Sequence, residues 1–169
     1  MAESLRQLEW YAGTDAEYIK RNEVSIYWDW LGVRCKARLD SILVDEGIVL
    51  DLKTTDTIDP SLFTKKVVGL GYDFQAAYYA KAAEVAFGKP FRFIFAAVER
   101  KAPYSVDLFE ASDEMMEEGM RKCEAALRRL KHCNDCNDWP NAAPVINTLR
   151  YPEWYQPFTE TEQTEEDLF

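Results

Sequence analysis

The segment from Gly47 to Thr55 constrains the fold of this chain more than any other. It reads GIVLDLKTT, the sequence of a buried strand that nevertheless carries Asp51 and Lys53 two residues apart. Side chains alternate between the two faces of a strand, so these charges share one face while Leu50 and Leu52 share the other. Buried strands rarely hold such charges without a partner, so the segment predicts both a central strand and a candidate site.

A second alternating segment ends just upstream, at Asp40. Between the two segments, residues 41–47 contain Asp-Glu-Gly and predict a turn. The resulting hairpin would bring Asp40 near Asp51. The apolar face of the upstream segment would consist of Val33, Cys35, Ala37 and Leu39, and its polar face of Arg34, Lys36, Arg38 and Asp40.

Two carboxylates and a lysine on adjacent strands predict a site for a hard divalent cation. Mg²⁺ prefers oxygen ligands and is usually held by one or two carboxylates, with Mn²⁺ as the alternative metal. Asp40, Asp51 and the backbone carbonyl of Leu52 are the candidate ligands. Lys53 would orient the attacking water or help to deprotonate it, while the metal polarises a phosphodiester. The alternative interpretation is a half-exposed hairpin with ordinary solvated charges.

A third segment, residues 71–79, places Gln75 and Tyr79 four residues apart, on one face of a predicted helix. The chain therefore contains three motifs in order: Arg38-x-Asp40, Asp51-Leu52-Lys53-Thr54-Thr55 and Tyr72-x-x-Gln75-x-x-x-Tyr79. Together they resemble the PD-(D/E)xK nuclease superfamily, most closely its phage and prophage exodeoxyribonuclease VIII (RecE-like) branch.

This resemblance implies an α/β fold with a restriction-endonuclease-like core, in which helices flank a mixed central β-sheet. It implies a Mg²⁺-dependent exonuclease that acts on double-stranded DNA ends in phage-type recombination. By the resemblance Asp40 and Asp51 would bind the metal, Lys53 would be the catalytic lysine, and Gln75 with Tyr79 would support the site. Related exonucleases form rings around DNA, so a homo-oligomeric ring and a single-strand annealing recombinase are the implied partners.

The family usually carries a further site residue, a His, on a helix before the first strand. Here the only His is His132, far downstream, so Glu9, Glu17 or Glu23 is the candidate substitute. Glu23 is also a possible metal ligand, or simply an exposed charge at a strand edge. The departure leaves two alternatives open: a truncated or degenerate domain that binds DNA or a recombination partner without cleaving, and an endonuclease on the same fold.

The formal net charge of -10 is unusual for a protein that would bind DNA phosphates. Part of it lies in residues 159–169, which hold five acidic and no basic residues. DNA binding would therefore depend on a local basic strip. The candidate strip residues are Arg34, Lys36, Arg38, Lys65 and Lys66.

The cysteines allow two interpretations. Cys133 and Cys136 lie beside His132, with Cys35 and Cys123 earlier in the chain, and some nucleases of the superfamily hold an iron-sulfur cluster on four cysteines. No second C-x-x-C pair exists, however, so reduced and mostly buried thiols are the simpler interpretation.

The organisation of the chain follows from its hydrophobic periodicity. We expect one nuclease-like domain over residues 1–158, with an N-terminal helical segment (1–22), a catalytic core (23–110) and a C-terminal helix with an aromatic segment (111–158). Residues 159–169 would form an acidic, disordered tail. The sequence contains no run of about 18 apolar residues and no charged-then-apolar leader, which favours a cytoplasmic protein without a membrane partner.

Within the core, the periodicity predicts strands and helices in a fixed order. Asp59-Pro60 and Ser112 are the expected helix starts. The predicted strands are residues 23–30, 33–40, 47–55, 91–98 and 104–109, and the predicted helices are 4–21, 60–68, 72–87 and a long one from Ser112.

Overall fold

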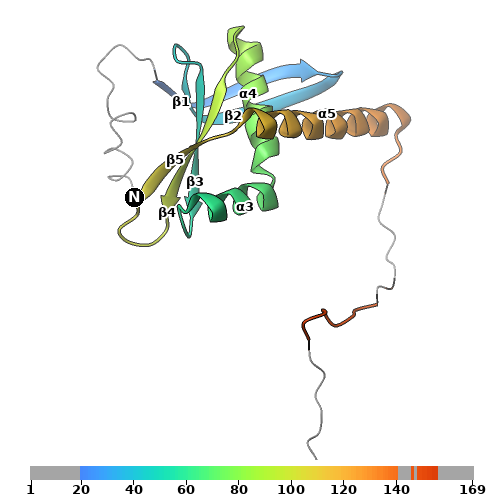
Figure 1. The fold of residues 1–169 in the computed structure, drawn as a ribbon. Coiled ribbons are helices and arrows are strands. Elements are labelled where there is room, and N and C mark those ends of the chain that lie inside the picture. The colour runs from blue at the N-terminus through green and yellow to red at the C-terminus, as the bar shows by residue number, and fades with distance from the viewer. Residues whose placement is uncertain (1–19, 141–145, 147, 156–169) are drawn as a thin grey trace, which may run out of the picture. The chain divides into compact units, whose positions relative to one another are not determined.

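The computed structural model of this protein describes residues 20–140, 146 and 148–155 (Figure 1). The chain divides into two units, Met1–Asp138 and Trp139–Phe169. The candidate acids Glu9 and Glu17 and the predicted acidic tail lie outside the described residues, as does most of the predicted N-terminal helical segment.

A mixed five-stranded sheet forms the centre of the first unit, as the sequence predicts. The spatial order of the strands equals their order along the chain. Neighbouring strands are antiparallel except β3 and β4, which run parallel. The strands are β1 (Lys20–Trp30), β2 (Val33–Leu43), β3 (Ile48–Thr55), β4 (Arg92–Glu99) and β5 (Val106–Glu110).

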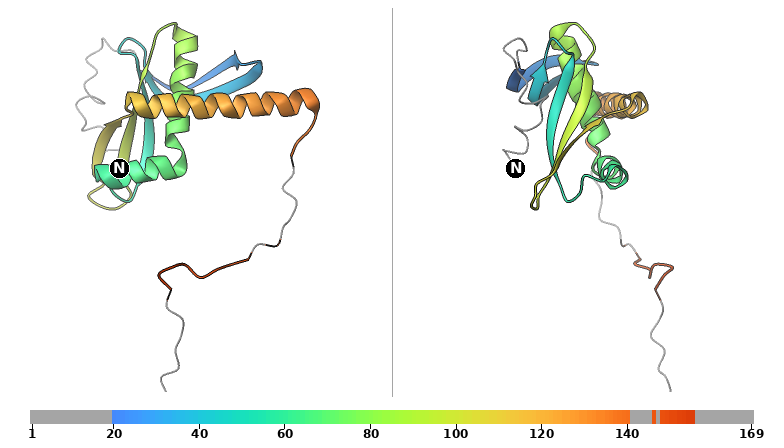
Figure 2. Two further views of the ribbon diagram at one scale, coloured as in Figure 1. Left: turned by 45° about the vertical axis from the view of Figure 1, so that its right-hand side comes forward. Right: turned by 60° about the vertical axis from the view of Figure 1, so that its left-hand side comes forward.

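Two helices, α3 (Pro60–Leu70) and α4 (Tyr72–Phe87), connect the parallel strands β3 and β4, because a parallel pair requires a crossover. Asp59 caps α3 by accepting hydrogen bonds from the N–H groups of Ser61 and Leu62. The long helix α5 (Asp113–Cys136) follows β5. Figure 2 shows these helices together on one face of the sheet.

The main hydrophobic core lies between the sheet and these helices. Phe63 of α3, Ala83 of α4 and Leu127 of α5 pack in the same cluster as Val49 and Phe95 of the central strands. A smaller cluster occupies the opposite face of the sheet, and it consists of Leu43, Ile48, Leu50, Ile94, Ala96 and Val98.

Two strand boundaries differ from the sequence prediction by three residues, and the other boundaries differ by two or fewer. Residues 20–22, predicted to end a helical segment, belong to β1 because they pair with residues 41–43. The turn predicted to begin at Ser41 begins later, because residues 41–43 also pair with residues 48–50 of β3 and so extend β2.

The alternation of β2 shifts by one residue near Asp40. Leu39 faces the main core, and so does Ile42, although strict alternation would place them on opposite faces. Glu23, across from this shift on β1, has a left-handed backbone with φ of 55°, a conformation that is uncommon for residues other than glycine. The irregularity therefore falls where the candidate ligand Asp40 leaves the regular strand.

Helices α4 and α5 cross closely at Gly119. A Cβ atom at this position would lie 2.2 Å from the backbone oxygen of Asp73 and 2.9 Å from Cβ of Ala77. Beside the crossing, Lys122 of α5 places Nζ 2.5 Å from Oδ2 of the buried Asp73. The crossing thus fixes the N-terminal turn of α4, which is the turn that carries Gln75.

The second unit exposes several large apolar side chains in its described part. Trp154 is 81% exposed, and Ile146 and Leu149 are also fully or almost fully exposed. The rings of Tyr151 and Tyr155 stack with centroids 4.0 Å apart.

In the ranges that the structure describes, no helix combines the length and the apolar character needed to span a membrane.

Candidate active site

Strand β2 separates from β3 after the Ser41–Leu50 pair, and we call this point the fork. Beyond it, the carboxylate of Asp40 replaces the missing strand partner: Leu52 donates its N–H to Oδ2 of Asp40 at 2.9 Å. In a strand, the N–H and C=O groups of one residue point to the same side. The backbone carbonyl of Leu52 therefore faces the same gap as Asp40, as the predicted ligand set requires.

Asp51, Lys53 and Gln75 form a closed set of contacts between β3 and α4. Lys53 Nζ lies 2.5 Å from Asp51 Oδ2 and donates to Gln75 Oε1 at 2.7 Å. Gln75 Nε2 donates to Asp51 Oδ1 at 3.2 Å. The structure thus brings Gln75 to Asp51 and Lys53, although Gln75 and Asp51 lie 24 positions apart in the sequence.

The electrostatics of this set centre on Asp51, which is only 1% exposed. Burial raises the pKa of Asp51, the adjacent Lys53 ammonium opposes that shift, and the negative charge of Asp40 adds to it. A carboxylate in such surroundings gains from an additional positive charge.

The donor set fits a divalent cation. Asp51 Oδ2 is buried and, apart from its ion pair with Lys53, has no hydrogen-bond donor among the described residues. One ammonium does not satisfy all the lone pairs of a buried carboxylate, and metal coordination is one way to satisfy the others. The two carboxylates and the Leu52 carbonyl match what Mg²⁺ usually takes from a protein.

Tyr72 is a residue at this site that the sequence does not single out beyond its place in the helix motif. Its ring centroid lies 4.6 Å from Lys53 Nζ, which is the geometry of a cation-π contact. The available signal was its spacing, because Tyr72 precedes Gln75 by three residues and so shares its helix face. Lys53 is therefore held by a carboxylate, an amide and an aromatic ring.

Tyr79 lies one turn beyond Gln75 but contacts different residues. Its ring is 6.5 Å from those of Phe93 and Tyr78, centroid to centroid. It packs at the edge of the main core, and its hydroxyl makes no hydrogen bond within the described part of the chain. The supporting role of Tyr79 stays a prediction.

Glu23 lies near Asp40 but is already paired. Its Oε2 is 3.0 Å from Nε of Arg38, and both side chains are exposed. Glu23 and Asp40 line one cavity of about 420 Å³. A role for Glu23 as a metal ligand stays a prediction.

The candidate DNA-binding residues form two groups rather than one strip. Arg34, Lys36 and Arg38 alternate with core residues of β2 and so lie on the sheet face opposite the described helices. Lys65 and Lys66 belong to α3, on the helical face. The two groups are separate because the basic side chains of β2 point away from the main core, whereas α3 packs on the core face of the sheet. Strand alternation alone does not show on which face α3 packs.

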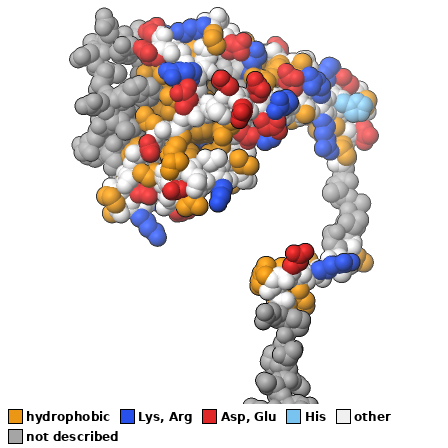
Figure 3. Space-filling model, viewed as in Figure 1, with side chains coloured by type: hydrophobic (Ala, Val, Ile, Leu, Met, Phe, Trp, Pro, Cys, Tyr) orange, Lys and Arg blue, Asp and Glu red, His pale blue; other side chains and the backbone are white. Residues whose placement is uncertain are grey.

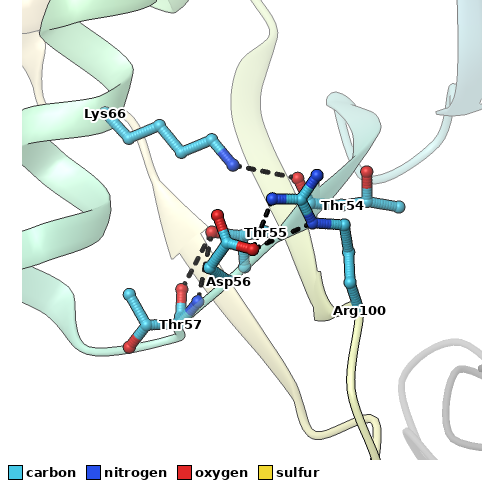
Figure 4. A network of polar contacts seen from close by, with 6 residues as sticks. All are labelled: Thr54, Thr55, Asp56, Thr57, Lys66 and Arg100. Atoms are coloured by element: carbon cyan, nitrogen blue, oxygen red, sulfur yellow. Dashed lines mark hydrogen bonds and ion pairs between the residues drawn. The ribbon is translucent and has the colours of Figure 1, made fainter.

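A polar network fixes the end of β3 (Figure 4). Lys66 of α3 donates to the backbone carbonyl of Thr54 at 3.1 Å. The buried Thr55 hydroxyl donates to the carbonyl of Thr57 at 3.0 Å, and Asp56 pairs with Arg100. These contacts hold the turn between the strand of Asp51 and helix α3.

The cysteines do not form a cluster. Cys35, Cys123 and Cys133 are buried free thiols, and Cys136 is exposed, with Sγ 3.7 Å from Nδ1 of His132. Over the described ranges, no three His, Cys, Asp or Glu side chains gather in a group that could hold a metal ion. The interpretation of the cysteines as reduced thiols stays a prediction.

Helix α5 presents mixed charge rather than a basic surface. Figure 3 shows acidic and basic side chains interleaved along it. Arg121 pairs with Glu118, Arg128 with Glu124 and Lys131 with Asp135. These cations are thus largely neutralised by their own helix.

Comparison with known proteins identifies the family and the fold. A family model described as "PDDEXK-like domain of unknown function" matches residues 6–152. The crystal structure of a protein from Eubacterium rectale, described as a "putative exonuclease", is 18% identical with a TM-score of 0.67, which shows a shared fold. The match covers 89% of this chain but only 59% of that one.

Two further comparisons add little. The crystal structure of SSO0001 is 16% identical over 72% of this chain and 56% of that chain, and its TM-score of 0.44 is too low to establish a common fold. Among curated proteins there is no match.

Proposed function

The chain belongs to the family of PDDEXK-like domains, and from that premise we propose that it is a divalent-metal-dependent deoxyribonuclease. The observation that carries the proposal is the buried Asp51 carboxylate, which is paired with Lys53 and lies close enough to Asp40 for the Asp40 charge to raise its pKa. Mg²⁺ is the proposed metal, with Mn²⁺ as a substitute.

Asp40, Asp51 and the backbone carbonyl of Leu52 would hold the cation. Once bound, it would polarise the scissile phosphodiester and stabilise the leaving oxygen. Asp40 is already fixed by the Leu52 N–H, and Asp51 is fixed by Gln75. Both carboxylates are therefore oriented before any substrate arrives.

Lys53 would orient the attacking water and balance the negative charge that develops on the phosphate. Its ammonium is held by Asp51 and Gln75 and lies over the Tyr72 ring. Only 13% of its side chain is exposed, so bulk water competes weakly for its hydrogen bonds. Gln75 would act as a positioning residue, and Tyr79 would support the helix that carries it.

Double-stranded DNA is the proposed substrate. The β2 group of Arg34, Lys36 and Arg38 ends next to Asp40 on the same strand. It lies on the sheet face opposite Asp51 and Lys53, so DNA that contacts this group would reach the site through the fork. The "putative exonuclease" description of the Eubacterium rectale protein supports exonucleolytic cleavage. The RecE-like resemblance supports a role in phage-type recombination in the cytoplasm, a ring-shaped homo-oligomer and a single-strand annealing recombinase as partner.

The test is digestion of end-labelled linear duplex DNA and of a closed circle, each with Mg²⁺, Mn²⁺ or EDTA. The Lys53→Ala variant would be compared with wild type and with Lys101→Ala, an exposed lysine outside the site. We expect metal-dependent shortening of the linear DNA, lost with Lys53→Ala and kept with Lys101→Ala. Cleavage by Lys53→Ala at the wild-type rate would contradict the assignment, and nicking of the circle would indicate an endonuclease.

The second candidate is a domain that binds DNA or a recombination partner without cutting. It is favoured by one observation, that the described residues bring only two carboxylates to the fork and Glu23 is paired with Arg38. Calorimetry with Mg²⁺ and Mn²⁺ separates the candidates, because a degenerate site would bind neither ion while an active one would bind at least Mn²⁺ at millimolar concentration or below.

A further inference from the structure

The edge of β3 that faces β2 is open beyond the fork. There Leu52 directs its N–H to Asp40, whereas Thr55 directs its carbonyl to the opposite edge, where the N–H of Arg100 donates to it at 2.9 Å. Backbone groups of successive residues point alternately to the two edges of a strand, so the carbonyls of Leu52 and Thr54 both point to the open edge. Because two residues span about 6.6 Å along a strand, the two carbonyls are separated by about that distance.

Lys66 places a cation at this open edge. Its side chain reaches from α3 to the end of β3, where Nζ donates to the Thr54 carbonyl at 3.1 Å (Figure 4). Helix α3 packs on the core face of the sheet, which is also the face toward which Asp51 and Lys53 project. An ammonium has three N–H donors, and Thr54 is the one acceptor that Lys66 has among the described residues. Two donors therefore remain for a ligand.

The charge of Lys66 is not neutralised by its own helix. Helix α3 contains two lysines and no acidic residue, whereas the cations of α5 pair with acids of the same helix. The pKa of Asp56 is lowered mainly by the hydrogen bond from Arg100 and to a smaller extent by the charge of Lys66. Asp56 already accepts two hydrogen bonds from Arg100. These two cations and one carboxylate carry one net positive charge, which favours an anion beside Lys66.

We propose that Lys66 binds the phosphate adjacent to the scissile phosphate on the DNA strand that is cut. A metal held by Asp40 and the Leu52 carbonyl would bind the scissile phosphate. Successive phosphates of one strand are separated by a distance similar to the step from the Leu52 carbonyl to the Thr54 carbonyl, so the neighbouring phosphate would lie at Lys66. The inference rests on the proposed nuclease function and adds a residue that sets which bond lies at the metal.

The chain contains a matched control for Lys66. Lys89 also donates from Nζ to a backbone carbonyl, that of Asp45 at 3.0 Å, and both lysines are half-buried. Asp45 precedes β3, so this contact lies at the opposite end of the strand from Thr54. Glutamine is the informative substitution at both positions, because its amide can still donate to a carbonyl but carries no charge. A purely structural contact would thus be largely kept while a phosphate contact would be lost.

The test uses the whole chain and linear duplexes that each carry one neutral methylphosphonate linkage at a different position around the mapped cleavage site. Single-turnover cleavage is measured with Mg²⁺ at protein concentrations below saturation. For wild type, a neutral linkage directly beside the scissile phosphate on one side should slow cleavage about tenfold, the lower range for a hydrogen bond to a charged group.

The variants should divide according to charge. Lys66→Gln should cleave unmodified DNA about tenfold more slowly than wild type and lose no further rate from that neutral linkage. Lys66→Arg keeps a cation that binds phosphate, so it should respond to the linkage as wild type does, and so should Lys89→Gln. Equal rates for Lys66→Gln and Lys89→Gln on unmodified DNA would overturn the contact. So would a Lys66→Gln variant as sensitive to the linkage as wild type.

Failure of this inference is distinguishable from failure of the nuclease proposal. Metal-dependent cleavage with either of the two overturning results would leave the nuclease standing. If wild type cleaves none of the duplexes, the nuclease proposal fails, and the affinities of the same duplexes in Mg²⁺ decide on Lys66. A linkage that weakens binding by wild type but not by Lys66→Gln would support the phosphate contact, and the lack of any such position would contradict it.

Discussion

Gln75 on α4 donates from Nε2 to Asp51 Oδ1 on β3 at 3.2 Å, and the same amide accepts from Lys53 through Oε1. One side chain thus fixes both charged members of the site. Replacing it with alanine would leave Asp51 and Lys53 paired with each other but without the amide that orients them.

For Gln75→Ala we expect the cleavage rate to fall about 10- to 100-fold, the usual cost of losing a residue that orients a metal ligand. The fold should persist, because Ala76 and Ala83 rather than Gln75 form the buried face of α4. At low pH the cleavage rate of Gln75→Glu should be lower than that of Gln75→Ala. The new carboxylate would add to the charge of Asp40 and raise the pKa of Asp51 further. Single-turnover rates across pH distinguish these outcomes, and identical profiles for both variants would contradict the positioning role.

Metal binding should stabilise the protein in a pH-dependent manner. At 100 times its dissociation constant, a ligand specific to the native state adds about 2.7 kcal/mol to the free energy of unfolding. Because the pKa of Asp51 is raised above its ordinary 3.8, protons compete with the cation up to a higher pH than for an exposed aspartate. The stabilisation by Mg²⁺ should therefore be full above the raised pKa and disappear as the pH falls through it.

In the metal-free protein the sign is opposite. A raised pKa means that Asp51 contributes stability below its ordinary value and that this contribution is lost as the pH rises through the raised pKa. Thermal unfolding with Mg²⁺ and with EDTA over a pH series measures both effects. Asp51→Asn should lose the metal response at every pH, and a Mg²⁺ response equal to wild type would exclude Asp51 as a ligand.

Gly119→Ala should destabilise the protein by roughly 2 kcal/mol or more, because the new methyl group would overlap the Asp73 carbonyl at the α4–α5 crossing. Gly69→Ala is the matched control. Gly69 lies in α3 with no atom within 4 Å of an added Cβ, so alanine should add about 0.5 to 1 kcal/mol of stability. Denaturant unfolding of both variants tests the pair, and equal effects would refute the close crossing.

Cys136 should be the thiol that reacts first with an alkylating reagent in the native protein. It is exposed, whereas Cys35, Cys123 and Cys133 are buried. Burial also raises the pKa of Cys123 to about 12, so its reactive thiolate is scarce at neutral pH and increases only as the pH rises toward that value. Mass spectrometry after brief iodoacetamide treatment should find one modified cysteine, and prompt labelling of Cys123 would contradict its burial.

Lys36→Ala should weaken DNA binding without changing sequence preference. Lys36 is exposed on β2, and its Nζ lies 5.3 Å from the Tyr27 ring centroid. If it contacts one phosphate, the slope of log affinity against log salt concentration should decrease by about 0.9. Binding would be measured on the Asp51→Asn background in EDTA, with Lys101→Ala as control, and an unchanged slope would remove Lys36 from the DNA-binding surface.

Much of this fold could be predicted from local pattern. Alternation identified the strands, and Asp59-Pro60 identified the start of α3. The motifs Asp51-x-Lys53 and Gln75-x-x-x-Tyr79, through the family resemblance, predicted that Gln75 lies beside Asp51 and Lys53, as the structure shows. These signals are short-range, since each depends on residues a few positions apart.

The rest of the fold and of the candidate site depends on contacts between segments that are distant in the sequence. The strand state of residues 20–22 comes from their partners in β2 rather than from their own propensities. The cation-π contact of Tyr72 with Lys53 and the two-sided division of the basic residues likewise follow from how α3 and α4 pack on the sheet. A single sequence holds no direct record of those long-range contacts.

The fork affects how an inactive form of the protein should be made for trapping a substrate complex. Asp40 stands in for a strand partner by accepting the Leu52 N–H, so replacing it with alanine would loosen the backbone as well as remove a ligand. Asp51→Asn preserves the side-chain shape and the amide contact to Gln75, and it leaves the Asp40 bond intact. Asp51→Asn is therefore the better inactive variant for crystallising this protein in complex with nucleic acid.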